Sequence, residues 1–116
     1  PAISLNSQLA FMTAYSNDVA SDMIFAQQVY AYGNPGDVLI GISTSGNSIN
    51  VVNAIKIANY KEVKTVGLIG KDGGEMKGIC DFSIKVALNS TAEVQERHLP
   101  IYHTICKILE EEFFNI

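Results

Sequence analysis

The clearest indication of the fold is the stretch Val38-Leu39-Ile40-Gly41-Ile42-Ser43-Thr44-Ser45-Gly46-Asn47-Ser48. Its first six residues are almost continuously apolar, which is typical of a strand buried on both faces of a parallel sheet. Small polar residues follow over 44–47 and indicate a turn. Residues 48–60 then carry apolar side chains at helical spacing and predict an amphipathic helix. A strand, a short turn and a helix in this order form the repeating unit of an α/β fold.

The same alternation continues on both sides of this unit. We expect these further elements: a strand over 2–6, a helix over 18–32, strands over 65–69 and 82–87, a short helix over 75–79 and a long helix over 92–114. The 82–87 segment alternates enough to suggest a sheet edge. Strands that alternate with helices pair in parallel through right-handed crossovers. The sequence thus predicts an α/β fold, with a parallel sheet flanked by helices, as one domain over residues 1–116.

Composition and charge argue against several classes of protein. Of the 116 residues, 47% are hydrophobic and 17% are charged, which is unlike a disordered chain. The net charge of −4 disfavours a nucleic-acid partner. We expect no membrane segment, because no apolar run reaches the roughly 20 residues of a membrane helix, and no signal peptide at the first residues. Cys80 and Cys106 form no metal-binding motif, and as two buried thiols they suit a reducing, cytoplasmic setting.

The turn after the 38–43 strand has the chemistry of a phosphate site. Four hydroxyl side chains lie within six residues: Ser43, Thr44, Ser45 and Ser48. In α/β sheets, ligands bind beyond the carboxyl ends of strands, where a helix N-terminus offers N–H groups to an anion. The turn has neither the lysine of a Walker A motif nor a GxGxxG pattern, so no nucleotide cofactor is indicated. A small phosphorylated molecule fits these neutral donors, although a simple helix cap with a polar turn explains the same residues equally well.

The segment Gly41-Ile-Ser-Thr-Ser-Gly-Asn-Ser48 resembles the sugar-phosphate loop of the SIS (sugar isomerase) domain family. With Gln95 and His103, it looks most like the phosphoheptose isomerases of that family. The resemblance covers nearly the whole chain, including Ser16-Asn17-Asp18 and Gly70-Lys71-Asp72-Gly73-Gly74. It implies a Rossmann-like, doubly wound SIS domain. The implied reaction is aldose–ketose isomerisation of sedoheptulose 7-phosphate to D-glycero-D-manno-heptose 7-phosphate through an enediol, in a homotetramer.

The resemblance also implies a role for each matching residue. The substrate-binding positions are Asn17, Asp18, Ser43, Thr44, Ser45, Ser48 and Gln95. His103 matches the catalytic histidine, and Gln95 and His103 match zinc ligands. These two residues are eight apart, about 12 Å along a helix, with Pro100 between them, where we expect a kink. The remaining histidine, His98, is expected at the surface or at an interface.

Two expectations concern the extent of the domain and its activity. In the family, an N-terminal helical segment and a first strand–helix unit carry the glutamate that acts as base at carbon. Neither matches any part of the chain, so we expect the domain to be truncated at its N-terminus and residues 1–116 alone to be inactive. The alternative is a non-catalytic SIS module that binds a sugar phosphate, in a transcription regulator or associated with a replication initiator. Gln95 and His103 favour the enzyme, because a sensor needs no acid–base histidine.

Overall fold

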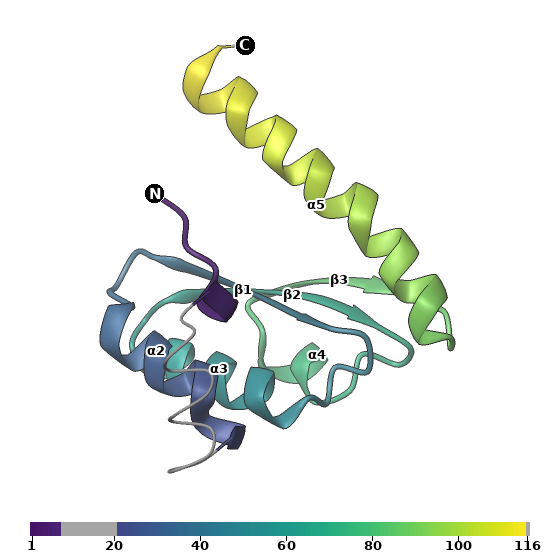
Figure 1. The fold of residues 1–116 in the computed structure, drawn as a ribbon, viewed down its shortest axis with the longest axis horizontal. Coiled ribbons are helices and arrows are strands. Elements are labelled where there is room, and N and C mark those ends of the chain that lie inside the picture. The colour runs from purple at the N-terminus through teal and green to yellow at the C-terminus, as the bar shows by residue number, and fades with distance from the viewer. Residues whose placement is uncertain (8–20, 116) are drawn as a thin grey trace.

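The computed structural model describes residues 1–7 and 21–115 (Figure 1). The elements in chain order are the 3-10 helices η1 (Leu5–Ser7) and η3 (Ser21–Met23), then α2 (Ile24–Tyr32), β1 (Val38–Ser43), α3 (Ile49–Tyr60), β2 (Lys64–Gly70), α4 (Met76–Ile79), β3 (Phe82–Val86) and α5 (Thr91–Phe114). Strands and helices alternate from α2 onwards, as the sequence predicts. Among the described residues, no helix is long and apolar enough to cross a membrane.

The three strands form one parallel sheet in the order β1-β2-β3. Ser43 at the end of β1 lies opposite Ile69 of β2, and Gly70 lies opposite Val86 of β3. The helices α2, α3 and α4 lie on one side of the sheet, and α5 lies on the other (Figure 1). This arrangement confirms the predicted α/β class with helices on both faces. It also places β3 at an edge of the sheet, as its alternating pattern suggests.

Apolar side chains between the sheet and helices α2–α4 form the core. One buried cluster joins α2 and α3 and consists of Val29, Ala54, Ala58 and Val63. The other joins α3, β2 and α4 and consists of Val52, Ile55, Ile69 and Met76. Gly41 lets the helices approach β1 closely, since a Cβ there would lie 3.2 Å from Ile55 Cδ1 and 3.3 Å from Met76 Cε. Each fully buried aliphatic side chain contributes about 1.5–3 kcal/mol. The core therefore anchors the sheet and α3 as one unit.

The structure corrects three predictions about local environment. Residues 2–6 are not a strand; Leu5–Ser7 is a 3-10 turn closed by a bond from the N–H of Ser7 to the carbonyl of Ser4. The β1 strand is not buried on both faces, because Ile40 and Ile42 are 48% and 49% exposed on the face away from α3. Cys106 is exposed on α5 rather than buried, while Cys80 is partly buried.

The predicted boundaries of the later elements agree with the structure to within a residue or so. The predicted 18–32 helix begins as the 3-10 turn η3 and becomes α-helical at Ile24; its first three residues lie outside the described part. Helix α5 starts at the N-cap Ser90, whose hydroxyl accepts the N–H of Glu93, and ends at Asn115 in the left-handed conformation. It runs through Pro100 without interruption.

Candidate functional site

The hydroxyl loop, residues Ser43–Ser48, connects the carboxyl end of β1 to the start of α3. Ser43 is 4% exposed, whereas Thr44 and Ser45 are half-buried and Ser48 is exposed. The Oγ atoms of Ser43 and Ser48 lie 2.8 Å apart and share a hydrogen bond, and Ser43 Oγ also accepts the N–H of Gly46 at 3.1 Å. The loop therefore has a hydrogen-bonded frame of its own.

Ser48 occupies the N-cap position of α3, but its side chain makes no capping hydrogen bond. Its hydroxyl instead bonds to Ser43 across the loop. Asn47, the residue before it, accepts the N–H of Glu75 through Oδ1 at 2.8 Å, which ties the loop to the segment before α4. Helix capping thus does not account for these two side chains.

The turn after β2, which contains Gly73 and Gly74, packs against the hydroxyl loop. Gly46 has a positive φ of 71°, and a Cβ there would collide with the carbonyl of Gly73. A Cβ on Gly74 would lie 2.5 Å from the carbonyl oxygen of Ser45. The N–H of Met76 donates to the carbonyl of Gly46 at 3.0 Å. The Gly73-Gly74 turn thus packs against the hydroxyl loop, a contact that only the tertiary fold reveals.

The first two turns of α5 attach to the carboxyl end of β2. A Cβ on Gly70 would lie 2.5 Å from Val94 Cγ1 and 2.7 Å from the carbonyl oxygen of Thr44, so α5, β2 and the hydroxyl loop meet at this glycine. One turn later, His98 is 2% exposed, and its Nε2 lies 2.9 Å from the carbonyl oxygen of Ile69. The prediction of His98 at the surface or an interface is therefore wrong. The spacing of residues along the sequence could have predicted the burial of His98, since Val94, His98, Ile101 and Ile105 repeat at intervals of four, three and four residues.

The other predicted site residues of α5 are exposed. Gln95 directly follows the buried Val94 at the point where α5 meets the sheet. His103 lies eight residues further along, with its ring in edge contact with that of Tyr102 at 5.3 Å between centroids. In the part of the chain that the structure describes, no hydrogen bond joins either residue to the hydroxyl loop. Asn17 and Asp18 lie outside the described residues.

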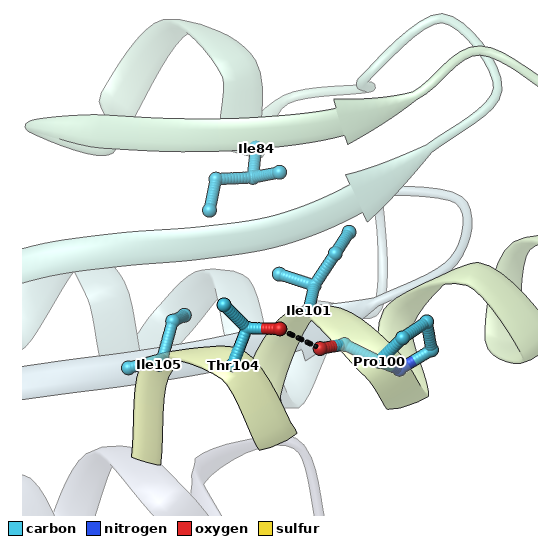
Figure 2. Close-up of a pocket in the computed structure, with 5 residues that line it drawn as sticks. All are labelled: Ile84, Pro100, Ile101, Thr104 and Ile105. Atoms are coloured by element: carbon cyan, nitrogen blue, oxygen red, sulfur yellow. Dashed lines mark hydrogen bonds between the residues drawn. The ribbon is translucent and has the colours of Figure 1, made fainter. Parts of the chain in front are cut away.

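A groove on the α5 side of the sheet contains none of the predicted site residues. Its lining is almost entirely apolar and consists of Ile84, Pro100, Ile101, Thr104 and Ile105 (Figure 2). The Thr104 hydroxyl donates to the carbonyl of Pro100 at 2.7 Å, so its polar group is satisfied within the helix. The groove therefore lacks the polar donors that a phosphorylated sugar needs.

Comparison with known proteins shows the family to which this chain is similar. The family model of the SIS domain matches residues 1–70. The chain is 47% identical over 112 residues to the phosphoheptose isomerase of Aliarcobacter butzleri, covering 97% of this chain and 59% of that protein. It is 48% identical over 114 residues to the phosphoheptose isomerase of Clostridium acetobutylicum, covering 98% and 58% respectively.

Two solved structures have the same fold. The phosphoheptose isomerase GmhA of Neisseria gonorrhoeae matches with a TM-score of 0.90 and 39% identity, over 92% of this chain and 61% of that one. A phosphoheptose isomerase from Francisella tularensis matches with a TM-score of 0.92 and 37% identity, over 96% and 60%. The chain spans about three fifths of the length of these relatives. On the family match over more than half of its residues, the chain belongs to the SIS domain family.

Proposed function

We propose that the protein is an aldose–ketose isomerase that converts sedoheptulose 7-phosphate to D-glycero-D-manno-heptose 7-phosphate. The observation that carries this proposal is the hydroxyl loop at the carboxyl end of β1, whose Ser48 side chain is free of a capping role. The names of the relatives agree with it, since the similar proteins and structures cited above are phosphoheptose isomerases. We propose further that the whole protein is cytoplasmic, and that residues 1–116 form the greater part of its SIS domain.

The hydroxyl loop binds the phosphate group in this proposal. Ser45 Oγ accepts the N–H of Asn47 at 3.1 Å, so its O–H remains able to donate to an anion. The hydroxyls of Thr44 and Ser48 are the other accessible donors, and Ser43 holds Ser48 from the buried side. The N-terminus of α3 adds a positive partial charge and free N–H groups at the same place. Neutral donors of this kind suit a phosphomonoester.

Isomerisation moves a proton between adjacent carbons through an enediol, so it needs a base at carbon and an acid–base group at oxygen. We assign the proton transfer at oxygen to His103, because imidazole is the side chain that both gives and takes protons most readily near neutral pH. Gln95, Asn17 and Asp18 contact the sugar in this assignment. No residue of this chain is assigned the base at carbon, which we propose comes from the further two fifths of the protein that the relatives have.

Zinc remains a prediction for this site. Within residues 1–7 and 21–115, no three His, Cys, Asp or Glu side chains lie close enough together to hold a metal ion. The two predicted ligands, Gln95 and His103, are about 12 Å apart along α5, and glutamine is not among the usual zinc ligands. The described residues therefore do not make a zinc site by themselves, and the roles assigned above to His103 and the loop hydroxyls do not depend on a metal.

We propose that the protein assembles as a homotetramer through α5. The outer stripe of this helix, defined here by five exposed residues at heptad spacing, consists of Leu99, Tyr102, Cys106, Leu109 and Phe113. It lies beside the residues of α5 that face the sheet, which are Val94, His98, Ile101 and Ile105. Apolar side chains that repeat every 3.5 residues pack against another helix with the same repeat. A second copy of α5 is a partner with this spacing.

The test is a coupled isomerase assay of the whole protein, with sedoheptulose 7-phosphate and, as a control, a hexose 6-phosphate. We expect turnover of the heptose phosphate above that of the hexose phosphate. Binding of the heptose phosphate without turnover would contradict the enzyme and favour the non-catalytic sugar-phosphate module. Neither binding nor turnover would contradict the assignment of the hydroxyl loop.

A further inference from the structure

His98 is a buried histidine to which the proposed chemistry gives no role. Its Nε2 lies 2.9 Å from the backbone carbonyl oxygen of Ile69. A carbonyl oxygen only accepts hydrogen bonds, so Nε2 carries a hydrogen and donates it. Nδ1 is buried and has no hydrogen-bond partner among the described residues. An apolar side chain of similar size would fill this position without the cost of burying polar atoms. The Nε2 bond is therefore the feature that distinguishes His98 from a residue that only packs.

The bond from His98 reaches the strand residue that lies beside the hydroxyl loop. Ile69 is the register partner of Ser43, which is the first residue of that loop and shares a hydrogen bond with Ser48. The preceding turn of α5 makes the second attachment, where Val94 packs on Gly70. Two points four residues apart thus connect α5 to the carboxyl end of β2. One is a van der Waals contact, and the other is a directional hydrogen bond.

The rest of α5 adds little to its own placement in this chain. Ile101 and Ile105 are half-buried beside the groove that Ile84 borders (Figure 2), and every described residue from 106 to 115 is exposed. The helix leaves the sheet beyond this region and projects away from it (Figure 1). A small change in the angle of α5 at His98 therefore shifts the residues that follow it along the helix. His103 lies five residues, about 7.5 Å, beyond His98.

We propose that His98 is a positioning residue. Its Nε2–H bond to the carbonyl of Ile69 sets the angle of α5 against the sheet, and thereby places Gln95 and His103 relative to the hydroxyl loop. The hydrogen bond is a property of this fold, whereas its effect on turnover rests on the proposed function. A packing contact such as that of Val94 tolerates rotation of the helix, but a hydrogen bond to a fixed strand carbonyl does not.

The test compares three variants of the whole protein. His98→Leu fills the site without a donor, and His98→Gln restores an amide N–H near the position of Nε2. Ile101→Ala is the matched control, because it removes packing from the same face of α5 without touching the hydrogen bond. Each variant is measured for thermal unfolding and for kcat and KM with sedoheptulose 7-phosphate. Imidazole ¹⁵N NMR of the wild type reports the tautomer of His98 independently of activity.

We expect His98→Leu to lower kcat by about 10- to 100-fold, the effect of misplacing a reacting group by an ångström or less. KM should change by less than about threefold, because the hydroxyl loop is intact. His98→Gln should recover most of kcat, and Ile101→Ala should lower the unfolding temperature with kcat nearly unchanged. Wild-type kcat in His98→Leu, or a parallel loss of kcat in Ile101→Ala, would overturn the proposal.

The NMR measurement stands even if a variant fails to fold. We expect a hydrogen on Nε2, and an Nε2 without a hydrogen would contradict the bond and with it the positioning role. A wild-type protein that shows the Nε2–H tautomer but no isomerisation would contradict the proposed function alone. The two failures are therefore distinguishable.

Discussion

At the scale of single residues, the position of a side chain in its helix does not by itself give its role in the site. Ser48 stands where a helix cap belongs, yet its hydroxyl bonds to Ser43. His98 has the helical spacing of an apolar core position and bonds to a strand carbonyl instead of solvent. The predicted catalytic residue, His103, is exposed on the same helix. A histidine beside solvent keeps access to a substrate and to water, as a proton-transfer group needs.

The role of His103 is tested by His103→Asn in the whole protein. Asparagine keeps a polar, hydrogen-bonding side chain of smaller size but has no group that titrates near neutral pH. We expect the fold and most of the substrate binding to persist while kcat falls by about 10²- to 10⁴-fold, the usual range for a lost acid–base group. The control is Thr104→Ala, the next residue along α5. Turnover of His103→Asn within a few-fold of the wild type would make His103 a structural residue.

At the scale of elements, the sequence predicts what depends on local pattern and misses what depends on neighbours. The strands at 38–43 and 65–69 and the helices that follow them are where apolar runs and helical spacing place them. The exposure of one face of β1 could not be predicted from the local pattern, because the burial of a strand depends on which element covers it. The expected strand at 2–6 fails for the same reason, since five residues of weak pattern form a strand only beside a partner.

Two reciprocal hydrogen bonds hold the start of β3 to β2 at the amino end of the sheet. The N–H of Thr65 donates to Asp81 Oδ2 at 2.9 Å, and the N–H of Asp81 donates to Thr65 Oγ1 at 2.8 Å. The bond from the Thr65 N–H is the main cause that holds the pKa of the Asp81 carboxyl below its ordinary value. A lowered pKa in the folded state stabilises the fold above the unfolded pKa, and the contribution is lost as pH falls through the folded pKa.

Asp81→Asn should therefore be less stable than the wild type at pH 7. The difference should shrink as pH falls below about 4, the ordinary range of an aspartate pKa, because the unfolded wild-type chain is protonated at Asp81 there and the folded chain becomes protonated at still lower pH. Urea unfolding at several pH values measures this. Glu96→Gln is the control, since Glu96 is an exposed carboxylate of α5. A stability difference that stays constant down to pH 2 would show that the charge of Asp81 plays no part.

At the scale of the whole molecule, the chain leaves large apolar surfaces uncovered. One is the α5 side of the sheet, where Ile40 and Ile42 are half-exposed, and the other is the outer stripe of α5, where Phe113 is 72% exposed. Contiguous apolar surface of this kind marks sites of association. The sequence predicted association only through resemblance to a tetrameric family, because which apolar residues are exposed is a property of the fold.

The outer stripe of α5 is tested by Leu109→Glu in the whole protein. A charge in the middle of an apolar helix–helix contact is costly to bury, so we expect the variant to have a smaller mass than the wild type in size-exclusion chromatography with light scattering. Lys107→Gln is the matched control, because it changes the net charge by the same amount outside the stripe. Equal masses for Leu109→Glu and the wild type would show that this stripe is not the interface.

Residues 1–116 expressed alone give a separate prediction. We expect no detectable heptose-phosphate isomerisation, because no residue of this chain is assigned the base at carbon. We also expect association rather than a monomer, because the α5 side of the sheet is exposed. The assay and light scattering on the same preparation measure both. Robust turnover would place the base within these residues, and a well-behaved monomer would show that the exposed surface does not drive association.

The central claim is that the hydroxyl loop binds the phosphate of the substrate, and calorimetric titration with sedoheptulose 7-phosphate tests it most directly. The variant is the double change Ser45→Ala with Ser48→Ala in the whole protein, and the control is Ser83→Ala, an exposed serine on β3. Each lost hydrogen bond to a charged group costs roughly 1.5–3 kcal/mol. The affinity of the double variant should therefore fall by at least two orders of magnitude, with Ser83→Ala unchanged. An unchanged affinity in the double variant would contradict the claim.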